Sequence, residues 1–152
     1  MIKEFVQAWD KNKDALRDYI KTHKQEEYCS YIDLVKLLFD IVINPEVEDR
    51  RGSDDFIFWS RFDTEHIHEI DDGDYQGSRI FLLHENAYQP SPGEYVYTSV
   101  YYGSCSGCDT LLAISEYGDG IPDDGQVDDY MTLCLHLLQK CHTMNETEDE
   151  DV

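Results

Sequence analysis

The sequence predicts an α+β domain with an N-terminal helical hairpin, an antiparallel sheet of three to four strands, and two C-terminal helices. Apolar residues have helical spacing before residue 45 and again near the end, and the segment between them is rich in β-branched and aromatic residues. The chain has 152 residues, of which 41% are hydrophobic, enough for one core. We expect a single domain over residues 1–144 and a disordered acidic tail over residues 145–152.

The two N-terminal helices are predicted from periodicity and from their end signals. Residues 2–23 repeat apolar side chains every three or four positions, as an amphipathic helix does. Ser30 lies three residues before Asp33, which is the spacing of a helix N-cap. The pair Asn44 and Pro45 predicts the end of this second helix.

The predicted strands are bounded by Gly, Pro or Asp and contain many Val, Ile, Tyr and Phe residues. They cover residues 56–62, 66–70, 79–84 and 94–102. After them, a Gly-rich turn leads into a short helix that Asp109 could cap. Apolar residues from Val127 to Cys141 then predict a final amphipathic helix.

The negative charge of the chain is concentrated in its last two thirds. The formal net charge is −21, with −2 in residues 1–51 and −19 in residues 52–152. Such a field repels nucleic acids and anionic membranes and attracts basic partners. Solubility is the competing explanation, because many soluble proteins carry excess carboxylates.

Acidic residues on the predicted sheet, its loops and the last helix are the candidate partner-binding residues. Together they could present an array of carboxylates comparable to the phosphates of DNA. They are Asp54, Asp55, Asp63, Glu65, Glu69, Asp71, Asp72, Asp74, Asp119, Asp123, Asp124, Asp128 and Asp129. The hypothesis requires that they gather on one surface.

The five cysteines include one local motif, the CSGC element from Cys105 to Cys108. A thiol pair between a strand and a helix is compatible with redox chemistry or with half of a zinc site. A second pair of zinc ligands would come from His66 with His68, Cys134 with His136, or Cys141 with His142. An anion-binding turn and a purely structural turn with buried thiols are the other two interpretations.

Catalytic motifs are missing from the sequence. It contains no GxSxG, HExxH or Walker motif, so binding is a better prediction than catalysis. We expect no cofactor, with zinc at Cys105 and Cys108 as the exception. The sequence has neither a long apolar run nor a secretory signal, and we therefore expect a cytoplasmic protein.

Part of the chain resembles a group of small phage and prophage proteins with no assigned activity. The resemblance is carried by DDGDYQG, AYQPS and YTSVYYGSCSGCDTLLAI, between Asp71 and Ile114, about a third of the chain. It implies a phage setting in the bacterial cytoplasm and supplies no catalytic residues.

Charge and resemblance together predict a phage-encoded acidic protein that occupies a basic, nucleic-acid-handling site on a host protein. Such a protein would act as a DNA mimic or anti-defence inhibitor without binding nucleic acid or membranes itself. The alternative is a small zinc-binding or redox thiol protein that uses Cys105 and Cys108. A structural or accessory phage component is the third possibility.

Overall fold

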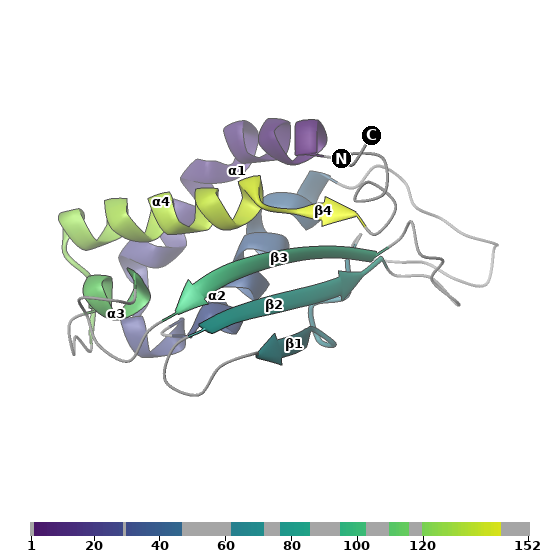
Figure 1. Cartoon of the computed structure of the whole chain (residues 1–152). Helices are drawn as coiled ribbons and strands as arrows, with labels where there is room; N and C mark the ends of the chain where they lie inside the picture. The colour runs from purple at the N-terminus through teal and green to yellow at the C-terminus, as the bar shows by residue number, and fades with distance from the viewer. Residues whose placement is uncertain are drawn as a thin grey trace.

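A computed structural model of the chain describes residues 2–28, 30–46, 62–71, 77–85, 95–102, 110–115 and 120–143. Helices from both ends of the chain pack on one side of a four-stranded antiparallel sheet with strand order β1-β2-β3-β4 (Figure 1). The predicted α+β class is thereby confirmed. The predicted strand at 56–62, apart from Phe62, lies outside the described residues, as do Asp109 and the tail after Thr143.

The N-terminal helices are α1 (Ile2–Thr22) and α2 (Tyr31–Leu37). Between them lies the short 3-10 turn η1 (Gln25–Glu27). The predicted N-cap is present, because the Asp33 amide donates to Ser30 Oγ. Beyond Leu37 the helix widens into the π-helical segment η2 (Leu38–Ile43) and then tightens into the 3-10 turn η3 (Asn44–Glu46).

The sheet contains β1 (His68–Asp71), β2 (Gly77–His84), β3 (Tyr95–Tyr102) and β4 (His142–Thr143). The first three strands lie within two residues of their predicted positions. The fourth was not predicted, because the predicted last helix ends at Cys141 and no element was assigned to His142 and Thr143.

The C-terminal helices are α3 (Thr110–Ser115) and α4 (Asp124–Gln139). The sequence predicted a last helix that reaches Cys141, but α4 ends two residues earlier and the chain turns back along β3. Cys141 is nevertheless buried, because this turn directs it into the core. The apolar period therefore predicted correctly that Cys141 is buried, but it placed the end of the helix two residues too late.

One face of the sheet packs against the helices and forms the core (Figure 1). On this inner face, Phe81, Leu83, Val96 and Thr98 are buried, and the Thr98 hydroxyl donates to the Leu137 carbonyl at 2.6 Å. This contact fixes α4 against β3.

An aromatic cluster links α1, η2 and the segment that leads to the sheet. Phe5, Phe39 and Phe62 are buried and pack edge to face, with ring centroids 5.3–6.0 Å apart. The Asn44 side chain adds two hydrogen bonds to the Phe62 backbone, accepting from its N–H at 2.9 Å and donating to its C=O at 3.1 Å. These bonds hold the chain where it enters the sheet.

A buried polar contact holds the start of α4 against η1. The backbone N–H of Gln25 donates to the Gly120 carbonyl at 2.8 Å. The Tyr130 hydroxyl donates to the side-chain Oε1 of Gln25, also at 2.8 Å. Gly120 has a φ of +83°, a left-handed conformation that suits glycine. The first turns of α4 are consequently fixed on the body of the protein.

Candidate functional site

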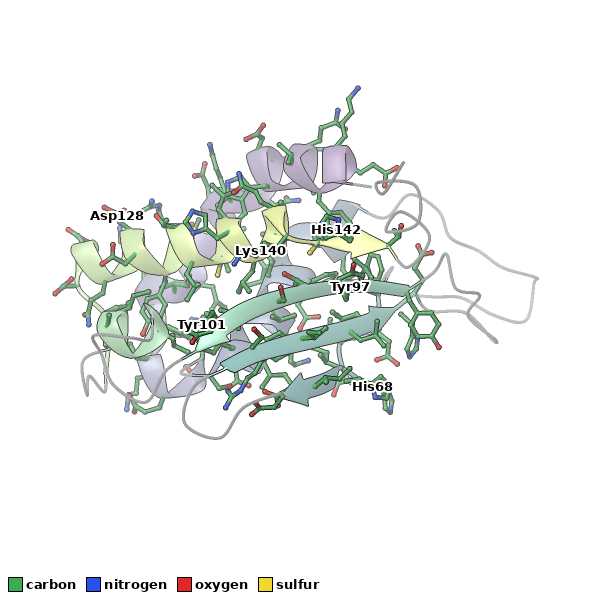
Figure 2. The ribbon with its side chains drawn as sticks, viewed as in Figure 1. His68, Tyr97, Tyr101, Asp128, Lys140 and His142 are labelled. Atoms are coloured by element: carbon green, nitrogen blue, oxygen red, sulfur yellow. The ribbon has the colours of Figure 1, made fainter. Side chains whose placement is uncertain are left out.

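The structure places the described partner-binding candidates in two groups. The edge group, on β1 and the segment before it, and the helix group, in the first turns of α4, lie on separate elements (Figure 2, with His68 marking β1 and Asp128 marking α4). The edge group is Asp63, Glu65, Glu69 and Asp71, and the helix group is Asp123, Asp124, Asp128 and Asp129. Asp54, Asp55, Asp72, Asp74 and Asp119 lie outside the described residues.

Most carboxylates of the edge group form salt bridges with lysine or arginine side chains of the same chain. Lys36 Nζ lies 3.0 Å from Glu65 Oε1, and Arg79 Nε lies 3.5 Å from Glu69 Oε1 and 3.4 Å from Asp71 Oδ2. Burial acts to lower the pKa of Lys36. The hydrogen bond to Glu65 and the nearby carboxylate of Asp40 outweigh burial and raise that pKa. These carboxylates are therefore already compensated within the chain.

Asp63 lies at the corner of the sheet between two imidazoles. Its Oδ2 is 2.8 Å from His66 Nδ1 and 3.7 Å from His84 Nε2, and its Oδ1 accepts from the Glu65 amide at 2.9 Å. Burial acts to raise the pKa of Asp63, but these hydrogen bonds and the two imidazoles outweigh it and lower that pKa. Asp63 is a local structural anchor for the turn before β1.

Asp123 has a structural role at the beginning of α4. Its side chain accepts from the Gln126 amide at 2.8 Å, while its own amide donates to Gln126 Oε1 at 3.0 Å. This reciprocal pair is a capping box. Carboxylates near a helix N-terminus are also stabilised by the helix dipole. Helix formation is therefore sufficient to explain Asp123.

The rest of the helix group is more available. Asp128 Oδ1 lies 2.7 Å from Arg17 Nη1 of α1, in a pair whose side chains are 66% and 42% exposed. Asp124 and Asp129 are exposed, and no residue in the described part of the chain forms an ion pair with either. Exposed ion pairs contribute little to stability, so a partner's cation could compete with Arg17 for Asp128.

The predicted metal residues Cys105 and Cys108 lie outside the described residues. Cys134 and Cys141 are free and buried, and burial raises the pKa of each thiol to about 12. At Cys141 a hydrogen bond with Thr98 acts in the opposite direction without overcoming burial. Both thiols are therefore protonated and inaccessible at neutral pH.

The histidines proposed as second zinc ligands are not assembled by the described structure. His66 precedes β1 rather than lying on it, so strand alternation does not orient it with His68. His136 is exposed whereas Cys134 is buried. Among residues that the structure describes, no three His, Cys, Asp or Glu side chains are grouped to hold a metal ion.

The outer face of the sheet was missed by the sequence prediction. Strand alternation places residues on the side opposite the buried core in registered rows, such as His68, Leu82, Tyr97 and His142. The described members of this outer face are His68, Ile70, Ser78, Ile80, Leu82, His84, Tyr95, Tyr97, Ser99, Tyr101 and His142. The alternating tyrosines of residues 95–101 were the available signal.

The comparisons of this chain with protein-family models, with curated proteins and with solved structures found no significant match. Within the described residues, no helix is long and apolar enough to cross a membrane.

Proposed function

We propose that this chain is an acidic binding protein that occupies a basic site on another protein. The observation that carries the proposal is the helix group, in which exposed carboxylates follow one another on a firmly held helix. The net charge of −21 would draw a cationic partner toward this surface and disfavour an anionic one.

The scaffold under the helix group is well suited to presenting charge. The inward side of α4 is buried through residues such as Val127, Tyr130 and Leu137, and the capping box fixes its first turn. Carboxylates on a rigid element lose little conformational freedom when they bind. Asp124 and Asp129 are the best candidates for direct contact, with Asp128 available by exchange from Arg17.

The proposal extends to the biological origin of this chain and to the class of protein that it binds. The resemblance to phage and prophage proteins supports a phage-encoded protein that acts in the bacterial cytoplasm. A nucleic-acid-handling host protein is the target class whose lysines and arginines are spaced to receive closely spaced negative charges. Inhibition by DNA mimicry would follow from occupation of such a site.

The test is affinity capture from bacterial lysate with the full chain and with two charge-matched variants. One is Asp124→Asn with Asp129→Asn, and the control is Asp10→Asn with Asp18→Asn on the exposed side of α1. Each double substitution removes the same charge, so general electrostatic attraction changes equally. Bound proteins are eluted with increasing salt and identified by mass spectrometry.

We expect the full chain and the α1 control to retain one basic nucleic-acid-handling protein until moderate salt. The α4 variant should release it at clearly lower salt, because screened charge pairs contribute to the complex. Equal elution from both variants would mean that the helix group is not the contact surface. Capture of no basic protein by the full chain would refute the proposed function.

A further inference from the structure

We propose that the outer face of the sheet binds an arginine-bearing segment of the basic partner. This inference rests on the proposed function and names a second contact surface together with the side chain that it recognises. Figure 2 shows Tyr97 and Tyr101 of β3, His68 of β1 and His142 of the edge strand β4.

The composition of the outer face is that of an interface rather than of ordinary protein surface. Tyr101 is 58% exposed and Ile70 is 54% exposed, which makes them two of the most exposed large apolar side chains described. Tyrosine is enriched at protein interfaces, and charged side chains are depleted at interface centres. The outer face has three tyrosines and has no Asp, Glu, Lys or Arg among its described members.

The aromatic side chains provide platforms for a planar cation. The rings of Tyr97 and His142 lie 5.8 Å apart with an interplanar angle of 40°, and those of His84 and Tyr95 are also 5.8 Å apart. A guanidinium group stacks on such rings through its planar face, whereas the compact, strongly hydrated lysine ammonium stacks less well. The outer face should therefore prefer arginine to lysine.

Charge complementarity identifies the occupant. The chain carries a net charge of −21, and the described members of the outer face include no Lys or Arg that would oppose a cation. A positively charged segment gains from this field, and an acidic segment is repelled. A second copy of the chain would bring another −21 against the first, so the observations favour a cationic partner over self-association.

The experiment uses two synthetic peptides of equal length, with either arginine or lysine alternating with serine. Binding to the full chain is measured by fluorescence anisotropy at about 0.15 M salt, where long-range attraction is largely screened. We expect the arginine peptide to bind about fivefold more tightly than the lysine peptide, as one or two cation–π contacts would give. In the Tyr97→Ala, Tyr101→Ala variant, this preference should disappear.

Two controls separate the outer face from general effects. Tyr101→Ala alone alters an exposed residue and keeps the fold even if Tyr97→Ala does not, and it should remove part of the preference. Ile121→Ser removes an equally exposed apolar side chain outside the sheet and should leave binding unchanged. Circular dichroism of each variant establishes that it is folded.

The outcomes distinguish this inference from the function on which it rests. If both peptides bind equally, or if Tyr101→Ala and the double variant bind like the full chain, the outer-face inference is wrong and the proposed function stands. If neither peptide binds, the proposed function fails and the inference fails with it. If sedimentation shows a dimer that Tyr101→Ala dissociates, the occupant is a second copy and the inference is overturned.

Discussion

The two faces of the sheet differ in burial although they are built from the same strands. Along β3, Val96, Thr98 and Val100 are buried against the helices, while Tyr97 and Tyr101, on the opposite side, are partly or largely exposed. Because side chains alternate along a strand, adjacent residues can serve folding and recognition independently. A substitution on one face should therefore leave the property that depends on the other face nearly intact.

The largest expected effect comes from emptying the inner face. Phe81→Ala should lower the free energy of unfolding by about 3–5 kcal/mol, because a fully buried ring is replaced by a cavity. Tyr101→Ala on the outer face should change it by less than about 0.5 kcal/mol. Urea unfolding followed by circular dichroism measures both, and similar losses would contradict the division between the faces.

An intermediate effect is expected where η3 holds the entry to the sheet. Asn44→Ala should cost about 1–3 kcal/mol, because it leaves the buried N–H and C=O of Phe62 without the partners that they have now. Asn44→Asp keeps the acceptor, but it loses the donor and buries a carboxylate beside the Phe62 carbonyl, so we expect it to cost at least as much as Asn44→Ala. If Asn44→Ala lowered the free energy of unfolding as little as Tyr101→Ala does, the stability of the fold would not depend on the Asn44 side chain.

The smallest destabilisation expected from the loss of a polar contact is at the corner of the sheet, and it depends on pH. The folded pKa of Asp63 lies below its unfolded value, so its stabilisation is present above about pH 4 and is lost as pH falls through the folded pKa. Asp63→Asn should therefore cost about 1 kcal/mol at neutral pH and progressively less in acid.

Urea unfolding at a series of pH values checks this, with His68→Gln as a control that should keep the wild-type pH dependence. A cost independent of pH would rule out the charge of Asp63 as its origin.

Composition shows how many carboxylates the chain has, but not which of them are available to a partner. The sequence identified the carboxylates, but it could not show that Arg79 lies beside Glu69 and Asp71 or that Asp123 caps α4. Among the candidates that the structure describes, those contacts reduce the available acids to a few on α4. The contact between Arg17 and Asp128 joins residues 111 positions apart, which no local pattern encodes.

The sequence by itself determined the helices, three of the strands, the Ser30 cap and the strong negative charge. These features depend on side-chain period and on contacts three or four residues apart, which the order of amino acids specifies directly. Tertiary structure alone decided which side of the sheet the helices cover, where β4 pairs with β3, and which carboxylates have cations beside them. The physical reason is that each of these depends on how distant segments pack, and packing brings together residues whose separation along the chain carries no signal.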